Sequence, residues 1–390
     1  MRIRIQRRGL VPAIVIAVVG TVLLYLGATY GVAAWHASRT SVESGVGTLP
    51  SQIENAPDTV ATTDEYGPVG SVSVVFAGTE AHHGLLGSID DPWIAMSAQS
   101  GEYRALLAPD LPDPVAGAVT TSPDGNRLAW VGDSGVVVYD TITGDSEELP
   151  VPGVSAVGAF APDGSMLLTY AADGLAVVDV TGGEVLATTE APPESVARAA
   201  WRPDGSAVDV VTGTQLTTVA LPSGDVTQHD TELPETSSLA WSPTGDRLVS
   251  MQEESGANPR LFVSEVSEDG ALGSPTQIDS TGFALDRLLG FSGERTISVV
   301  ALQLQSGSLE QIFDLPLDGR SASPLTALPS PGENWAGTPT LSVATDNLYQ
   351  GSSEFPDRVW PWSYTSRLAG CILVSLFLFG LYVTRRPRRP

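Results

Sequence analysis

The segment Ala118-Val-Thr-Thr-Ser-Pro-Asp-Gly-Asn-Arg-Leu-Ala-Trp130 decides the fold, because its central motif recurs along the chain. The motif returns at Pro162-Asp163-Gly164 and Pro203-Asp204-Gly205, and in altered form at Pro243-Thr244-Gly245. The prolines at 123, 162, 203 and 243 are 39, 41 and 40 residues apart. Such a regular spacing indicates a repeated structural unit of about 40 residues.

Each copy of the motif predicts a tight turn between two strands, because Pro fixes φ near −65° and Gly tolerates the positive φ that follows. Weaker copies lie at 290–295 and 341–349. A second signal has the same period: apolar runs such as 136–140 and 176–179 lead into turns centred on Gly101, Gly144, Gly183, Gly224, Gly270 and Gly319. Four strands in about 40 residues are typical of one blade of a β-propeller.

With its Ser/Ala-Pro-Asp-Gly turns followed by apolar strands, the chain resembles the TolB-like and WD-repeat propellers over about residues 70–355. The Trp-Asp and Gly-His pairs of true WD repeats are missing, so the TolB-like group fits better. The fold class is therefore all-β, a propeller of about seven, alternatively six, four-stranded blades. Residues 71–107 lack an inner strand and 338–351 supply inner strands, so we expect the two ends to pair and close the ring.

The N-terminal end predicts a membrane anchor. The 25 residues from Leu10 to Ala34 carry no charge, which exceeds the length of about 20 residues that crosses a bilayer. Four arginines in the tip, residues 1–9, keep that end cytoplasmic by the positive-inside rule. We expect a transmembrane helix at 10–35; cleavage after the small residues 32–34 stays open as an alternative.

A second transmembrane helix is predicted at 368–384, followed by a basic cytoplasmic tail at 385–390. The juxtamembrane segment 357–367 contains two Trp and one Tyr, residue types that favour the membrane interface. A buried core helix and a surface-sorting tail are the alternatives. Both termini are then cytoplasmic, and the propeller (70–356) lies outside the plasma membrane. Residues 36–69, rich in Ser, Thr, Gly and acidic residues, are expected to form a flexible linker.

The charge is strongly asymmetric. All 45 acidic residues lie between His36 and Arg367, and this segment contains eleven arginines and no lysine, which gives a formal charge of −34. Such a negative field excludes nucleic acid as a partner. Codon bias or adaptation to high salt explains the missing lysines. Cys371 is the sole cysteine, so no intramolecular disulfide forms.

The residues of catalytic chemistry are scarce. There are four histidines and no lysine, and no nucleophile elbow, metalloprotease helix or phosphate loop is present. We therefore predict no enzymatic activity, no catalytic residue and no cofactor. Trp130, Trp201 and Trp241 recur near equivalent strands and are expected to pack in the interior.

Two weak metal-binding hypotheses arise. His82 and His83, with Asp90 and Asp91 nearby, offer imidazole and carboxylate groups, although adjacent residues of a strand point to opposite faces. The series Asp124, Asp163 and Asp204 suggests repeated calcium sites, but aspartates that cap their own turns explain it sufficiently.

The clearest functional prediction concerns four long insertions, at 78–92, 252–260, 273–288 and 325–337. All fall between the second and third strands of a unit or between units, so they share one face of the propeller. Long irregular loops are often functional, and a tolerated surface insertion is the alternative. We expect this face to bind a protein in or near the membrane through His82, His83, Asp91, Glu253, Glu254, Arg260, Asp286, Asn334 and Trp335.

The predicted function is accordingly that of a scaffold or accessory module of a membrane or envelope complex. A ligand-sensing or hydrolytic propeller that uses the central channel is one alternative, and a structural envelope protein is another, because the fold alone does not choose among them.

Overall fold

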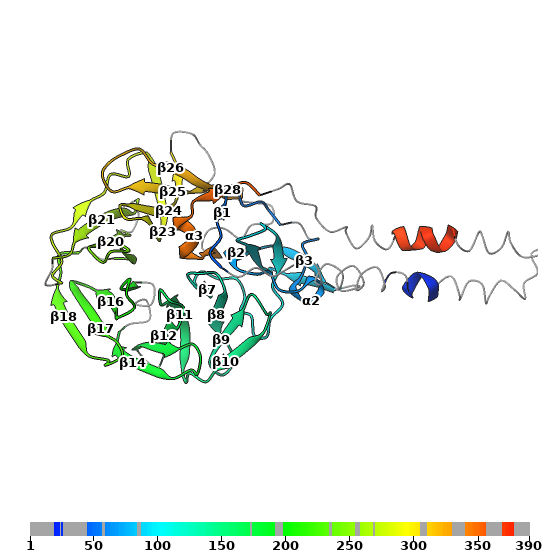
Figure 1. The fold of residues 1–390 in the computed structure, drawn as a ribbon, viewed down its shortest axis with the longest axis horizontal. Coiled ribbons are helices and arrows are strands. Elements are labelled where there is room, and N and C mark those ends of the chain that lie inside the picture. The colour runs from blue at the N-terminus through cyan, green and yellow to red at the C-terminus, as the bar shows by residue number, and fades with distance from the viewer. Residues whose placement is uncertain are drawn as a thin grey trace, which may run out of the picture.

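The structure is a computed structural model that describes residues 19–23, 25, 45–56, 59–83, 87–171, 174–191, 198–233, 236–253, 258–267, 270–304, 310–329, 340–355 and 369–377. Six four-stranded antiparallel sheets are arranged around a common centre, as Figure 1 shows. This is an all-β propeller of six blades. The expectation of about seven was wrong, and six, the alternative, is confirmed.

Blade 1 explains the difference, because it is assembled from both ends of the ring. Its inner strand β27 (Ser342–Val343) comes from the C-terminal side and pairs with β2 (Val72–Ala77), followed outward by β5 (Trp93–Ser97) and β6 (Tyr103–Ala105). Val343 lies opposite Val74 in this antiparallel pairing. The two incomplete units at the ends of the sequence repeat are therefore one blade.

The other five blades follow the chain, each from its inner to its outer strand. Blade 2 contains β7 (Val119–Thr121), β8 (Arg127–Val131), β9 (Val136–Asp140) and β10 (Ser146–Leu149); blade 3 contains β11 (Val154–Phe160), β12 (Met166–Ala171), β13 (Gly174–Asp179) and β14 (Val185–Glu190). Blade 4 contains β15 (Ala199–Trp201), β16 (Ala207–Thr212), β17 (Gln215–Ala220) and β18 (Val226–Asp230); blade 5 contains β19 (Ser238–Trp241), β20 (Arg247–Gln252), β21 (Arg260–Glu265) and β22 (Thr276–Gln277). Blade 6 contains β23 (Phe283–Gly293), β24 (Thr296–Gln303), β25 (Glu310–Pro316) and β26 (Ser323–Ala327).

The Pro-Asp-Gly motifs form the turns between first and second strands, as predicted. Gly125, Gly164, Gly205 and Gly245 all have φ near +70°, a conformation that glycine adopts without strain. At Gly125 a side chain would also collide with the backbone of Val72 in the neighbouring blade. These turns and the glycine turns between third and fourth strands lie on one face, here called the turn face. The connections between second and third strands and between blades start from the opposite face, here called the insertion face.

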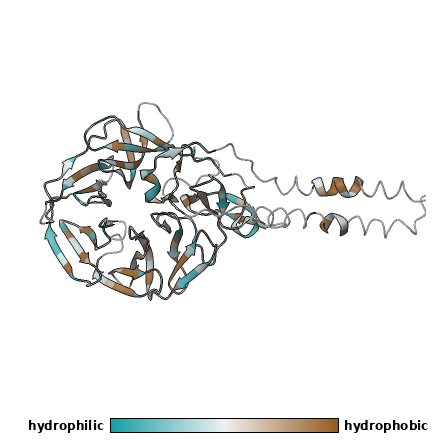
Figure 2. Cartoon of the chain, in the orientation of Figure 1, coloured by the Kyte–Doolittle hydropathy of each residue, from teal (hydrophilic) through white to brown (hydrophobic). Residues whose placement is uncertain are grey.

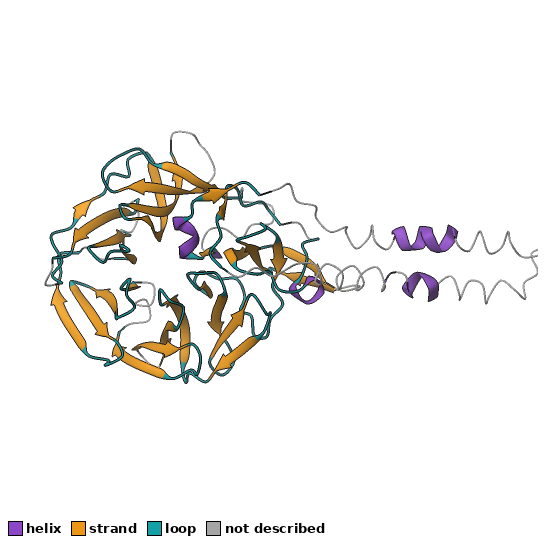
Figure 3. Ribbon diagram, in the orientation of Figure 1, coloured by secondary structure: helices purple, strands orange, loops and turns teal. Residues whose placement is uncertain are grey.

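The last copy of the repeat differs from the others. After β27 the chain forms the short helix α3 (Thr345–Tyr349) in place of a turn and a second strand. Figure 3 shows α3 on the inner side of the ring. The amide of Asp346 donates to the carbonyl of Pro123 at 2.9 Å, so α3 rests against the first turn of blade 2.

The predicted flexible linker is wrong for residues 45–56 and 59–69, because these residues pack onto the ring. β1 (Leu49–Pro50) pairs in parallel with β28 (Ser352–Ser353), Gln52 bridges Ala327 on the outer edge of blade 6, and Thr62 bridges Ala105 on the outer edge of blade 1. The short helix α2 (Thr63–Tyr66) follows. Apolar residues spaced through the stretch are buried in the core between blades 6 and 1; they are Leu49, Ile53, Ala56 and Val60.

Neighbouring blades enclose separate apolar clusters, and Figure 2 shows apolar residues along the strands of every blade. Trp130 and Trp201 are buried in these clusters, and Trp241 packs against one, which confirms the interior packing predicted for them. Trp201 also donates from Nε1 to the carbonyl of Ala159 in the preceding blade at 2.9 Å. The blades are thus joined by packing and by occasional polar contacts.

Within the described residues, no helix is long and apolar enough to cross a membrane. The two predicted anchors are described in part, at 19–23, 25 and 369–377, and these residues are helical. The basic tips 1–9 and 385–390, residues 36–44 of the predicted linker and the juxtamembrane segment 357–367 lie outside the described residues.

Candidate functional site: the insertion face

The ring order brings the four insertions together. Insertion 78–92 belongs to blade 1, 252–260 to blade 5, 273–288 joins blade 5 to blade 6, and 325–337 joins blade 6 to blade 1. Blades 5, 6 and 1 are consecutive around the ring. Because antiparallel strands alternate in direction, the strands that flank all four connections begin or end at the insertion face. We call this part of the face the insertion sector; the sequence predicted the shared face but not that half of the ring carries all four.

Insertion 78–92 forms its own hairpin of β3 (Glu80–His83) and β4 (Gly87–Asp90). Glu80 lies directly opposite Asp90, and His82 lies opposite Ser88, so all four belong to one side of the hairpin. Ala81 of the other side is buried, which anchors the hairpin to blade 1. The exposed side therefore presents two facing carboxylates beside one imidazole.

The charges of this hairpin are only partly balanced. The imidazole Nε2 of His82 is 4.0 Å from a carboxylate oxygen of Glu80. Like charges directly opposite each other destabilise a strand pair, so Glu80 and Asp90 favour the approach of a positive group. Asp91 follows with φ of 48°, and its amide donates to the carbonyl of Thr79 at 3.0 Å, which closes the base of the hairpin.

The other predicted contact residues are spread over the sector. Arg260 begins β21 opposite Gln252, with exposed Glu253 at the start of the loop between them. Asp286 is exposed but lies within β23, because that strand begins at Phe283 and shortens the expected insertion. The side chain of His83 and residues Glu254, Asn334 and Trp335 lie outside the described part of the structure.

The repeated aspartates have a structural role in the turn face. The carboxylate of Asp163 accepts hydrogen bonds from the hydroxyl and the amide of Ser165, and these bonds lower its pKa. Asp204 is held in the same way by Ser206. Asp246, one position past the glycine, accepts from Ser242 and Thr244. Turn capping therefore accounts for the series that suggested calcium.

Within the described residues, no group of three or more His, Cys, Asp or Glu is arranged to hold a metal ion. Burial raises the pKa of Tyr139 to about 12, and its ring packs against Trp130 between blades, which is a structural role. Burial and the nearby Asp124 raise the pKa of Asp346 at the edge of α3. Asp124 already accepts hydrogen bonds from Ser122 and from the amide and side chain of Asn126.

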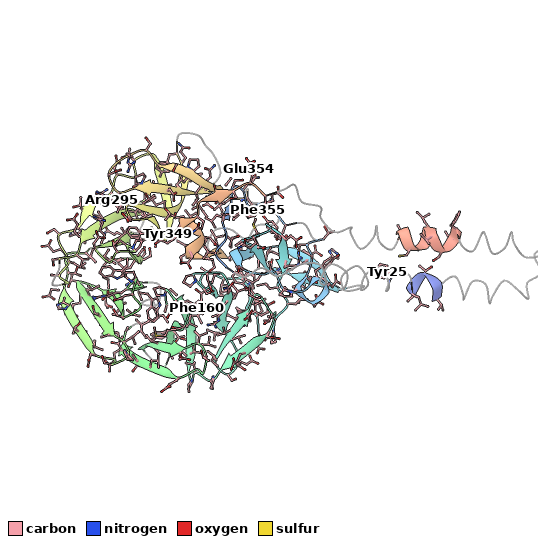
Figure 4. The ribbon with its side chains drawn as sticks, viewed as in Figure 1. Tyr25, Phe160, Arg295, Tyr349, Glu354 and Phe355 are labelled. Atoms are coloured by element: carbon pink, nitrogen blue, oxygen red, sulfur yellow. The ribbon has the colours of Figure 1, made fainter. Side chains whose placement is uncertain are left out.

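The two ends of the propeller meet on the opposite face, which the sequence did not predict. Gln99, in the turn between β5 and β6, donates to the carbonyls of Gly45 and Val46 at 3.2 and 3.3 Å. A side chain placed on Gly101 of the same turn would collide with Phe355. Figure 4 labels Phe355 just after β28, where the chain leaves the propeller. Both chain ends therefore leave the propeller beside one turn of the turn face.

Comparisons with solved structures give distant matches only. TolB from Acinetobacter baumannii matches with a TM-score of 0.44 and 16% identity over 72% of this chain and 69% of that one. Hydrazine synthase from Kuenenia stuttgartiensis matches at 0.42 and 17% over 56% and 67%, and the β-propeller domain of Cps50 (Swd1) from Myceliophteria thermophila at 0.42 and 11% over 65% and 85%. No protein-family model and no curated sequence matches. At this level of similarity the fold class rests on the six sheets, and function rests on the site.

Proposed function

We propose that the chain is an extracytoplasmic six-bladed propeller, anchored in the plasma membrane at both ends, whose insertion sector binds a protein partner of a membrane or envelope complex. The observation that carries this proposal is the opposition of the two faces. Both chain ends leave beside the turn at 98–101, whereas the strands that flank all four long insertions begin or end at the other face. An anchored propeller of this design presents its insertions away from its attachment points.

The chemistry of the sector favours a basic partner surface. The segment between His36 and Arg367 has 45 acidic residues against eleven arginines. Glu80 and Asp90 face each other on the exposed hairpin, so a partner's Lys or Arg side chain relieves their repulsion. Electrostatic complementarity of this kind steers association and makes it sensitive to ionic strength.

Recovery of a partner tests the binding role. The full chain is purified from gently solubilised membranes, and co-purifying proteins are identified by mass spectrometry. The variant Glu80→Lys is expected to lose the partner, while the matched control Glu147→Lys on exposed β10 of blade 2 retains it. Equal recovery with both variants would remove the hairpin from the interface. Consistent recovery of the chain alone, at high abundance in envelope fractions, would favour a structural envelope role.

Cysteine labelling tests the topology separately. Ser88→Cys places a thiol on the exposed side of β4, and the native Cys371 lies in the predicted membrane segment. A membrane-impermeant maleimide is expected to label Ser88→Cys on intact cells but not a cysteine appended to the C-terminus. Labelling of the C-terminal cysteine, or protection of Ser88→Cys until the cells are lysed, would contradict the proposed orientation.

The pair of Asp124 and Asp346 at α3 is the observation that bears most on the channel-based alternative, because an elevated pKa is a feature of catalytic acids. Three donors already engage the carboxylate of Asp124, however, so that group acts as a turn cap. The scaffold function fits the described residues better.

A further inference from the structure

In the helical residues 369–377 the apolar side chains are exposed and a polar side chain is buried, which is the reverse of a helix on the surface of a water-soluble protein. Leu373 and Phe377 are each 67% exposed, and Ile372, Val374 and Leu376 are exposed as well. The one buried side chain of this stretch is a polar residue, Ser375, at 7% exposure. Its hydroxyl is buried without a hydrogen-bond partner. A helix in lipid is expected to turn its apolar side chains outward and a polar side chain inward, because small and polar residues mediate helix packing there.

The N-terminal helical residues repeat this pattern. Leu23 is 63% exposed, and Val19 and Val22 are exposed beside it, whereas Tyr25 is 2% exposed. A residue on the surface of a lone helix cannot be covered so completely by its own helix, because the side chains of neighbouring turns point away from the axis. Another part of the chain must therefore cover the ring of Tyr25.

Each helix has a narrow polar stripe on its covered side. Thr21 and Tyr25 are four residues apart, and so are Cys371 and Ser375, a spacing that places two side chains on one helix face. Thr21 and Cys371 are half-buried, and Tyr25 and Ser375 are buried. Figure 4 labels Tyr25 at the propeller end of the N-terminal helical piece, and Figure 2 shows apolar residues in both pieces.

A second, independent observation concerns the propeller. Residues 45 and 355 both lie at the turn 98–101, so the two segments that connect the ring to the helices start from neighbouring points. The connections span 20 residues from Tyr25 to Gly45 and 14 from Phe355 to Ala369. Two helices that start from one place on the ring are readily brought into contact.

We infer that the two terminal helices pair inside the membrane as an antiparallel hairpin, in contact through the stripes Thr21/Tyr25 and Cys371/Ser375. This inference rests on the proposed membrane anchoring. The first helix runs outward and the second runs inward, so Tyr25 is level with Cys371, and Thr21 is level with Ser375. The hairpin is then one rigid anchor, with its apolar sides turned to lipid, that fixes the orientation of the propeller.

The native cysteine makes the pairing testable with a single substitution. In Tyr25→Cys the new thiol faces Cys371, and a mild oxidant such as copper phenanthroline converts the two thiols into an intramolecular disulfide. In the matched control Leu23→Cys the thiol is on the exposed side of the same helix. We expect Tyr25→Cys to cross-link at least tenfold faster than Leu23→Cys in membranes. An engineered protease site in the loop between β20 and β21 reveals the cross-link, because the two fragments stay joined on a non-reducing gel.

A second pair of cysteine substitutions controls for a local distortion caused by the substitution at position 25. Thr21→Cys with Ser375→Cys, in a Cys371→Ser background, is expected to cross-link as well, while Leu23→Cys with Leu373→Cys in that background does not. Equal rates for inward and outward pairs, or no cross-link in either inward pair, would overturn the pairing.

Extraction of the membranes with alkaline carbonate separates this result from failure of the anchoring. Retention of the protein without cross-linking contradicts the pairing alone. Release of the protein from the membrane contradicts the anchoring, and the paired anchor with it.

Discussion

Blades 2–5 and the closure of the ring are held together by different kinds of contact. In blades 2–5 every strand pairs with its neighbour in sequence, and the turn aspartates bond to residues two positions away. The closure, which comprises residues 45–62, β27, α3 and β28, joins residues about 300 positions apart. The amide of Gly47, for example, donates to the side chain of Asn347 at 2.8 Å, and Asn347 donates in turn to the carbonyl of Val72 at 3.2 Å.

This difference in contacts determines how blades 2–5 and the closure resist local unfolding. Contacts between neighbouring strands close short loops, whereas the closure has to bring together residues about 300 positions apart, at a larger cost in loop entropy. Blade 1 also depends on the closure for its inner strand. The closure should therefore respond to mutations that local repeat structure tolerates, and three measurements sharpen or break that distinction.

The largest effect is expected inside the regular blades, at Arg202, which forms an ion pair within blade 4 and contacts Trp241 of blade 5. Arg202 Nε is 2.8 Å from the carboxylate of Asp209, which is fully buried, and the guanidinium lies 5.4 Å from the ring centre of Trp241 in blade 5. Arg202→Ala leaves the buried carboxylate without its counter-charge and should lower the free energy of unfolding by about 3–5 kcal/mol.

Urea unfolding of the purified chain measures this loss. Asp209→Asn is the control, because it removes the buried charge and leaves a guanidinium that is partly exposed to solvent, so it should cost less than Arg202→Ala. The reverse order would show that the buried carboxylate of Asp209 is held mainly by groups other than Arg202, such as the hydroxyl of Thr218 that donates to it.

The second effect tests the closure itself. Ile53 is buried in the cluster shared by blades 6 and 1, in a segment that the sequence suggested was a linker. Ile53→Ala should lower the free energy of unfolding by about 2–5 kcal/mol, as for other large-to-small core substitutions. Val226→Ala on the exposed strand β18 should change it by less than about 0.5 kcal/mol. A similar small change for both variants would return residues 45–62 to the role of a linker.

Amide hydrogen exchange shows which strands are destabilised by Ile53→Ala. In Ile53→Ala the amides of β2 and β27 are expected to exchange faster than those of β12 and β16, because the weakened closure opens first. Uniform acceleration over all blades would mean that the ring unfolds only as a whole.

The same division separates what the sequence predicts from what it does not. The repeat predicts the turns at Gly125, Gly164 and Gly205 and the strands around them, because local spacing and turn chemistry determine both. The two incomplete end units predict that the chain ends pair and close the ring, and the pairing of β27 with β2 confirms it. The repeat does not decide between six blades and seven, because each incomplete unit can be counted as a blade of its own. The burial of Leu49 and Ile53 is not predicted either, because their segment lacks strand periodicity and pairs with Ala327 and Ser352, which lie about 275 to 300 residues later in the chain.

The candidate site also has features that the sequence predicts and features that it does not. The repeat phase identifies which insertions share a face, since strand direction alternates along each unit. Their gathering on blades 5, 6 and 1 depends on blade number and ring closure, and the opposition of Glu80 and Asp90 depends on the register of a hairpin that interrupts the repeat. The spacing of polar residues predicts the polar stripes of the terminal helices, but it does not predict which side of each helix is buried.

The smallest effect concerns the sign of the pH dependence, which should be opposite in the two regions. Hydrogen bonds from Ser165 lower the pKa of Asp163 below 3.8, so its contribution to stability is present above that pH and is lost as the pH falls through the lowered value. Burial, with the nearby Asp124, raises the pKa of Asp346 above 3.8. Its contribution is fully present below pH 3.8 and is lost as the pH rises through the raised value, so at neutral pH this carboxylate weakens the docking of α3.

Thermal unfolding at pH 3.5 and pH 7 separates the two cases. Asp346→Asn should raise the melting temperature at pH 7 and leave it nearly unchanged at pH 3.5, because the native carboxyl is already largely protonated there. Asp163→Asn should lower the melting temperature at pH 7, and the difference from the native chain should shrink toward acid pH. If both variants shift in the same direction at pH 7, ionisation does not distinguish the closure from the turns of the regular blades. Opposite shifts would mean that acidification favours a closed ring while it weakens the turns that shape each blade.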